Sequence, residues 1–166
     1  MTEYPASVRL ATPSDAPALL YHVRSNIADN LDSIGFGQKT PIDEAKLKER
    51  ILLGCNRIGG VIGVIESDDN EIIASTAIFA SQPWWTDTWV LTQFWVYVDI
   101  DERKGTHHGD DLLQFAKWFR EDRSVAAGYN IPLEMGVMTG NRVQAKIRWW
   151  RRHTDGMIGA LFRVGG

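Results

Sequence analysis

One stretch, residues 89–119, constrains the fold of this chain more than any other. It reads WVLTQFWVYVDIDERKGTHHGDDLLQFAKWF. A long run of aromatic and β-branched residues ends at Val98, as is typical of a buried strand. A polar turn follows, and an amphipathic helix begins near Asp110. This order predicts an anion pocket, because the unpaired N–H groups and the dipole of a helix start both favour negative charge.

The turn carries the residue types that bind a phosphate or a pyrophosphate. Arg103 and Lys104 supply charge, and Thr106 supplies a hydroxyl donor. Gly105 and Gly109 let the backbone approach a ligand closely. The chain has no GxxxxGK[ST] loop, and its glycines do not fit a Rossmann fingerprint, so neither nucleotide motif is predicted. A solvated basic loop is the alternative interpretation.

The other elements are predicted from periodicity and from turn residues. Strands are expected at 7–11, 58–65, 72–79, 89–98, 133–138 and 157–164, and helices at 12–27, from 40 to about 53, 110–123 and 141–152. The order β-α-α-β-β-β-α-β-α-β indicates an α/β (α+β) fold: a mixed, largely antiparallel central sheet with helices on both faces. No repeat, linker or low-complexity segment interrupts the chain, so residues 1–166 are predicted to form a single domain.

Composition narrows the class of protein. A chain of 166 residues with 44% hydrophobic and 23% charged residues can bury one core. The net charge of −3 argues against a general binder of polyanions, although a local basic patch stays open. Cys55 is the only cysteine, which excludes an internal disulfide and favours a reducing, cytoplasmic location. The first residues, MTEYPASVRL, have no signal-peptide core, and no apolar run could span a bilayer, so no membrane association is predicted.

Over nearly its whole length, from VRLATPSDAPAL to the last predicted strand, the sequence resembles the GNAT superfamily of acyl-CoA-dependent N-acetyltransferases. The central motif of that family is a strand ending near V-x-P, then R/Q-x-x-G-x-G/A, then a helix. The corresponding positions here are Val98 at the strand end, Ile100 for the proline, Arg103 or Lys104 for the basic residue, His107 or His108 for the first glycine, and Gly109 for the last small residue.

The resemblance implies acetyl-CoA as the cosubstrate. Its pyrophosphate would lie on the turn and its pantetheine arm along the end of the central strand. That strand would diverge from 133–138, and backbone N–H groups at the gap would polarise the thioester carbonyl. The cofactor-binding residues expected on this basis are Val96, Tyr97, Val98, Arg103, Lys104, Gly105, Thr106, His107, His108, Gly109 and Asn141.

The resemblance also points to the positions of the catalytic groups. Family members often place a Glu on the central strand, where this chain has Thr92 and Gln93; Gln93 could orient a water or the substrate. The usual acid is a Tyr, and its position corresponds here to Trp149 or Trp150. Tyr97 supplies a nearby hydroxyl. Gln93 and Tyr97 are therefore the candidate catalytic residues.

Three functions are compatible with these features. The first is an acetyl-CoA-dependent N-acetyltransferase that acts on an amine-bearing acceptor of unknown identity. The second is a catalytically impaired GNAT-like protein that binds CoA or serves as a scaffold. The third is a nucleic-acid-associated protein that uses the basic residues of the last helix. GNAT-like domains often pair, so a homodimer is open. The spacing of the histidines is not diagnostic of a metal site, and no metal is predicted.

Overall fold

The computed structural model describes residues 4–30, 42–136 and 143–153. Its elements are β1 (Arg9–Leu10), the 3-10 helix η1 (Pro13–Asp15), α1 (Ala16–Asn30), α2 (Glu44–Cys55), β2 (Gly60–Glu66), β3 (Ile72–Ser81), β4 (Val90–Val98), the 3-10 helix η4 (Ile100–Glu102), α3 (His108–Ala127), β5 (Leu133–Met135) and α4 (Val143–His153). The predicted strand at 157–164 lies outside the described residues. The order of the other predicted elements is confirmed.

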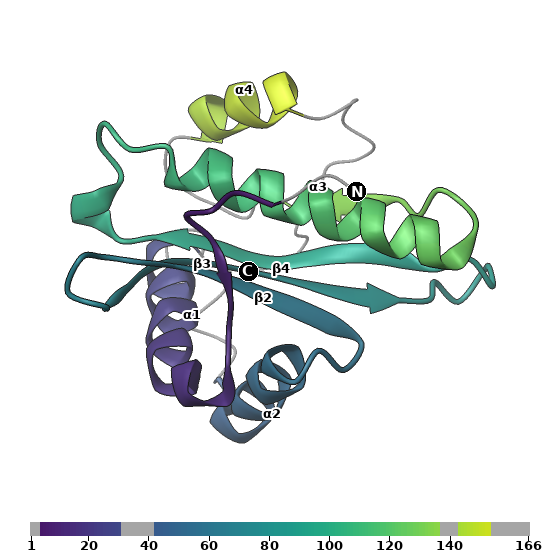
Figure 1. Cartoon of the computed structure of the whole chain (residues 1–166), viewed down its shortest axis with the longest axis horizontal. Helices are drawn as coiled ribbons and strands as arrows, with labels where there is room; N and C mark the ends of the chain where they lie inside the picture. The colour runs from purple at the N-terminus through teal and green to yellow at the C-terminus, as the bar shows by residue number, and fades with distance from the viewer. Residues whose placement is uncertain (1–3, 31–41, 137–142, 154–166) are drawn as a thin grey trace, which may run out of the picture.

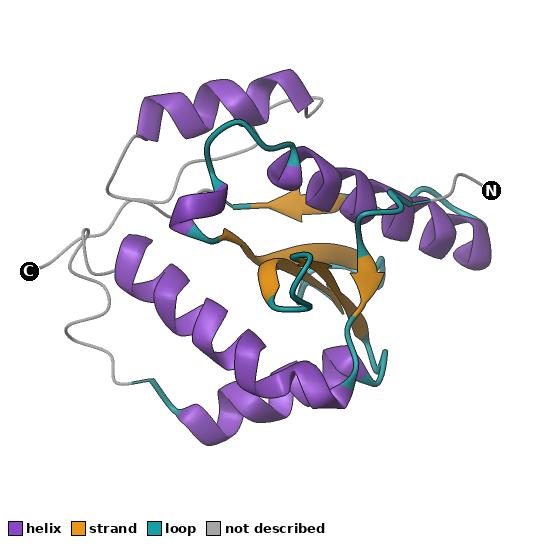
Figure 2. Cartoon of the chain, turned by 60° about the vertical axis from the view of Figure 1, so that its left-hand side comes forward, coloured by secondary structure: helices purple, strands orange, loops and turns teal. Residues whose placement is uncertain are grey.

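The strands form one mixed sheet in the order β1-β2-β3-β4-β5. The first four pair antiparallel, and β4 pairs with β5 in parallel. Helices α1 and α2 cover one face, α3 covers the other, and α4 lies beyond α3 (Figure 1). The view in Figure 2 shows the sheet between these helical layers. The predicted fold class, a largely antiparallel sheet with helices on both faces, is therefore confirmed.

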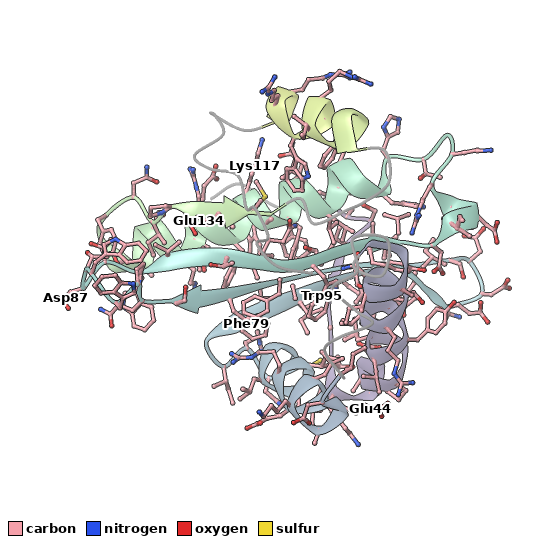
Figure 3. The ribbon with its side chains drawn as sticks, turned by 180° about the vertical axis from the view of Figure 1, so that it is seen from behind. Glu44, Phe79, Asp87, Trp95, Lys117 and Glu134 are labelled. Atoms are coloured by element: carbon pink, nitrogen blue, oxygen red, sulfur yellow. The ribbon has the colours of Figure 1, made fainter. Side chains whose placement is uncertain are left out.

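A separate apolar core stabilises each face of the sheet. Beneath α1 and α2 the buried residues include Leu19, Ile51 and Phe79. Phe79 and Trp95 both point toward these two helices (Figure 3). Against α3 the buried residues include Leu112 and Phe115. Burial of such side chains contributes roughly 1.5–3 kcal/mol each, so the two cores fix the helices on the sheet.

Two helix boundaries differ from the prediction. The predicted first helix begins as the 3-10 turn η1, in which the Thr12 N–H donates to Asp15 Oδ2 at 2.7 Å. Helix α3 continues past the loop predicted from Ser124, because Gly128 closes it in the left-handed conformation at φ 76°. The Gly128 N–H donates to the carbonyls of Ser124 and Val125, as a C-terminal glycine commonly does.

A buried histidine links α1 to the sheet. His22 Nε2 lies 3.0 Å from the Ile72 carbonyl oxygen, and Nδ1 lies 2.9 Å from Ser75 Oγ. The Trp95 indole N–H also donates to Ser75 Oγ, at 3.1 Å. A carbonyl can only accept, so Nε2 carries a proton, and in the neutral ring the Ser75 hydroxyl would donate to Nδ1. Burial also lowers the pKa of His22, which favours the neutral imidazole.

This histidine is expected to make folding stability depend on pH. The unfolded chain takes up a proton near pH 6.5, whereas folded His22 resists protonation, so stability is complete above that pH and falls as the pH drops below it. One proton contributes at most about 1.4 kcal/mol per pH unit. Urea unfolding between pH 5 and 8 should show this slope, and His22→Gln should remove it. His107→Gln, at an exposed site, is the control; parallel curves for wild type and His22→Gln would contradict the prediction.

Candidate functional site

The candidate site lies along β4 beyond Gln93, the last residue that pairs with β5 in the described chain. The two strands pair at only three positions, Leu91 with Leu133, Thr92 with Glu134 and Gln93 with Met135. Beyond Gln93, residues 95–98 of β4 pair with β3 alone, as far as the described residues extend. Within the described residues the ladder thus ends at Gln93 and Met135, and the divergence expected between these strands stays a prediction, because residues 137–142 lie outside them.

A β-bulge lies directly after Gln93. Ala77 of β3 pairs with Trp95 and Ile78 pairs with Gln93, so Phe94 has no partner across the ladder. The Thr76 hydroxyl donates to the Trp95 carbonyl at 2.9 Å and stabilises this geometry. A bulge changes which face the following side chains occupy. Leu91 accordingly packs in the core beneath α3, whereas Trp95 packs in the core beneath α1 and α2.

Gln93 is buried, and its amide Nε2 donates to Thr76 Oγ1 at 3.0 Å. On β3, the residues on either side of Thr76 face α1 and α2: Ser75 bonds to His22, and Ala77 belongs to the core beneath these helices. Thr76 and the Gln93 amide therefore lie on the α3 side of the sheet. A neutral amide in this position can orient a ligand but cannot carry a proton to or from it.

Tyr97 is buried on the opposite face, toward α1. Its ring lies 4.8 Å from that of His22 and 5.5 Å from the Arg103 guanidinium carbon. The pKa of Tyr97 is raised, chiefly by burial, and the Asp99 carboxylate raises it further. The structure therefore separates Gln93 from Tyr97, and their catalytic roles stay predictions.

The turn after β4 is built by η4 and a glycine. Gly105 has a left-handed φ of 76°, a conformation that glycine adopts most readily. Thr106 Oγ1 donates to the Glu102 carbonyl at 2.5 Å, which closes the turn on η4. Arg103 Nε donates to the Val98 carbonyl at 2.6 Å, so the arginine folds back over the strand end. Lys104 is exposed.

Helix α3 begins at His108, and the sequence-predicted small residue Gly109 lies in its first turn. His107, the N-cap, makes no side-chain capping hydrogen bond. A Cβ added to Gly109 would meet only Trp149, at 3.8 Å, within the described chain. His107 Nδ1 lies 3.6 Å from Asp110, and His108 Nε2 lies 3.9 Å from Glu102. The turn and the helix start, here called the cradle, thus present backbone donors that no side-chain cap covers.

One contact at this cradle was not predicted from the sequence. The Trp149 indole N–H donates to Asp110 Oδ1 at 3.0 Å and joins α4 to the first turn of α3. The resemblance instead places Trp149 or Trp150 at the position of the usual catalytic tyrosine. No local pattern distinguishes these two roles, since the contact joins residues 39 positions apart. Asn141, the last predicted cofactor residue, lies outside the described part of the chain.

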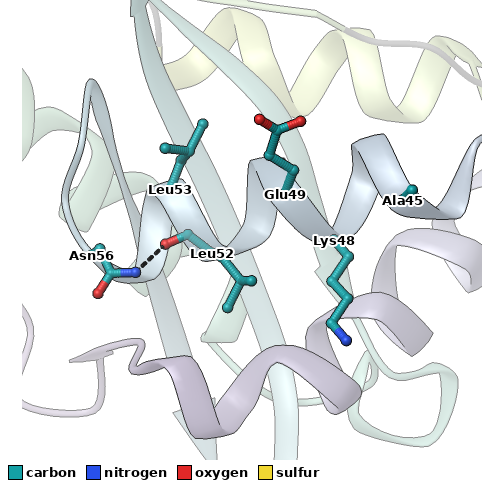
Figure 4. A pocket seen from close by; sticks show the side chains of 6 residues that line it. All are labelled: Ala45, Lys48, Glu49, Leu52, Leu53 and Asn56. Carbon is teal, nitrogen blue, oxygen red and sulfur yellow. Dashed lines mark hydrogen bonds between the residues drawn. The ribbon is translucent and has the colours of Figure 1, made fainter.

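Two other surface features lie away from the cradle. Trp84 and Trp85, 92% and 69% exposed, stack edge to face in the loop between β3 and β4. Asp87 of this loop marks the end of the sheet opposite to the turn (Figure 3). A hollow of about 400 Å³ on α2 is lined by Ala45, Lys48, Glu49, Leu52, Leu53 and Asn56 (Figure 4). Neither feature includes a residue of the cradle.

Comparison with known proteins agrees with this architecture. No protein-family model matches the sequence, and no curated protein matches it. Several solved structures do match this chain. A possible acetyltransferase from Clostridium difficile 630 aligns at TM-score 0.65 and 14% identity, over 96% of each chain. An aminoglycoside acetyltransferase from an uncultured soil metagenomic sample, in complex with trehalose, aligns at a TM-score of 0.62 and 12% identity, over 96% of this chain and 95% of that chain.

A ribosomal-protein-alanine N-acetyltransferase from Brucella melitensis biovar Abortus 2308 gives a TM-score of 0.60 at 11% identity, over 96% of this chain and 97% of that one. The chain therefore has the GNAT-like acetyltransferase fold. Among the helices that the structure describes, none combines the length and the apolar character needed to cross a bilayer.

Proposed function

We propose that the protein is an N-acetyltransferase that uses acetyl-CoA. The observation that carries this proposal is that the described ladder between β4 and β5 ends at Gln93, on the strand that leads directly into the glycine-containing turn and the start of α3. Main-chain groups of β4 beyond Gln93 suit the amides of a pantetheine arm. The turn and the first residues of α3 suit a diphosphate. Acetyl-CoA is one ligand that contains both a pantetheine arm and a diphosphate, so it could bind along the end of β4 and reach the turn.

In the proposed reaction the acceptor nitrogen attacks the thioester carbonyl carbon. A C–N bond forms, the C–S bond breaks, and the thiolate leaves with the electron pair. The nitrogen loses a proton, and the products are an acetamide and the CoA thiol. Main-chain N–H groups at the bulge would stabilise the developing oxyanion. Gln93 and Tyr97 remain the candidates for orienting the acceptor and for supplying a proton.

Isothermal titration of the protein with acetyl-CoA tests the proposal. We expect binding, and weaker binding of acetyl-pantetheine, which lacks the diphosphate that the turn would hold. Release of CoA thiol in the presence of an amine panel should follow. Absence of acetyl-CoA binding would contradict the proposal outright.

A CoA-binding protein without catalysis is the second candidate. Two observations favour it: the Gln93 amide is engaged by Thr76, and Trp149 is engaged by Asp110, so neither position offers the usual acid or base. Tight binding of acetyl-CoA with no thiol release against any amine would support this candidate over the first.

Association with nucleic acid stays a weaker proposal. It rests on the exposed side chains of Arg148, Arg151 and Arg152 on α4. Binding to RNA or DNA that falls steeply as salt rises would support it. We also propose that the protein forms a homodimer and that it is located in the cytoplasm.

A further inference from the structure

Arg50 of α2 lies over two aromatic rings of the sheet, one of which is at the bulge in β4. Its guanidinium carbon lies 5.2 Å from the ring centre of Phe79 and 5.7 Å from that of Phe94. The two rings are themselves 5.1 Å apart and nearly perpendicular. Cation–π contacts of this kind hold the planar group over the rings.

Phe94 ties this arrangement to the site. It is the residue that the bulge leaves without a partner in β3, and it directly follows Gln93, the last residue of β4 that pairs with β5. Its side chain is 52% exposed, which is unusual for an aromatic residue in a central strand. Arg50 therefore stands on the α2 side of the place where the thioester would lie.

Within the part of the chain that the structure describes, the N–H groups of Arg50 contact no acceptor. In the described residues, no carboxylate pairs with Arg50 and no hydrogen bond from it is found, whereas Arg9 and Arg24 are both paired with acids. Contact through the face of the guanidinium leaves its edge donors unused. These donors match the two oxygens of a carboxylate, or those of a phosphate, in a bidentate way.

We propose that Arg50 binds the anionic group of the acceptor, so that the amine acetylated is one that also carries a carboxylate or a phosphate. The inference rests on the proposed function. Arg50 is then a specificity-determining residue: it anchors the anion, and the amine nitrogen of the same molecule is directed toward the thioester. Phe79 and Phe94 fix the guanidinium, which reduces the loss of side-chain entropy on binding.

The test compares amines that differ only in the anion. Thiol release from acetyl-CoA is measured with L-amino acids against their amides, and with phosphoethanolamine against ethanolamine. We expect kcat/KM at least 10-fold higher for the anionic member of one pair, and the better pair distinguishes carboxylate from phosphate. Arg50→Met, which keeps length and ring contact, should abolish this preference by raising KM for the anionic amine and leaving the neutral amine within 2-fold.

Two further variants keep the result interpretable. Arg50→Lys keeps the charge without the planar fork and should lose only part of the preference. Lys48→Met removes an exposed cation from the same helix and should change nothing. The melting temperature and the acetyl-CoA affinity of each variant are measured in parallel to verify the fold and the cofactor site.

The outcomes separate the inference from the proposed function. If acetyl-CoA binds and neutral amines react as well as anionic ones, the inference is overturned and the proposed function stands. If no amine reacts, binding of the same amines is titrated in the presence of CoA, and absence of Arg50-dependent binding overturns the inference. If acetyl-CoA itself does not bind, both fail.

Discussion

Reversal of both charges in the turn, Arg103→Glu together with Lys104→Glu, is expected to weaken acetyl-CoA binding by about 100-fold or more. A charge-assisted hydrogen bond contributes roughly 1.5–3 kcal/mol, and every 1.4 kcal/mol is tenfold in affinity. Lys104 is exposed at the turn, and Arg103 lies over the end of β4, so both cations lie where the diphosphate is proposed to bind. Two anions there would add repulsion to the lost contacts.

Isothermal titration at two salt concentrations measures this effect. The control is Lys48→Glu with Arg57→Glu, which alters the net charge by the same amount at exposed positions on and just after α2. Because Arg103 also donates to the Val98 carbonyl, the single variant Lys104→Glu isolates the contribution of a charge with no such contact to the strand. Equal affinities for the turn variant and the control would place the diphosphate elsewhere.

Gly60→Ala is expected to lower the free energy of unfolding by about 3 kcal/mol, near the upper end of the cost of overpacking a core. A Cβ at Gly60 would lie 2.3 Å from Phe79 Cδ1 and 2.5 Å from the Ile78 carbonyl oxygen. The carbonyl belongs to the paired strand β3, so relief of the clash would require movement of the ladder between β2 and β3. The side chain of Phe79 is itself fully buried and cannot move away cheaply.

Gly136→Ala provides the control for this prediction. No atom of the described chain lies within 4 Å of a Cβ built at Gly136. Urea unfolding followed by tryptophan fluorescence should show the loss for Gly60→Ala and a change below about 0.5 kcal/mol for the control. Equal midpoints for the two variants would mean that the strands near Gly60 are less tightly packed than the distances indicate.

Much of the fold could be predicted from the sequence, because most of its elements carry local signals. Thr12 with Pro13 marks a helix start, and the β-branched run at 72–79 marks a strand. The sequence predicts too early an end for α3, because serine, here Ser124, is common in loops. In the structure Ser124 remains helical, and its hydroxyl accepts a hydrogen bond from the Ile131 N–H at 2.9 Å.

The site was predictable only in part. The glycines and cations of the turn are adjacent in the sequence, so their proximity needs no tertiary information. The bulge at Phe94 is different, because strand alternation gives no sign of it. Counting by twos places Leu91 and Trp95 on one face, whereas they belong to the cores on opposite sides of the sheet. The stacking of Arg50 on Phe94 also depends on this bulge and on how α2 packs, which no local pattern encodes.

Beyond Gln93, one side of β4 has no strand partner within the described residues, and this affects how long the protein would survive in a cell. A strand with unpaired main-chain groups along one side is a template for strands of other molecules. In the described chain β4 has such a side beyond Gln93, and the proposed ligand would cover it. Any ligand that binds only the folded chain also adds to its stability by mass action. The supply of acetyl-CoA would then govern how much of the protein survives degradation and self-association, apart from any acetyl group transferred.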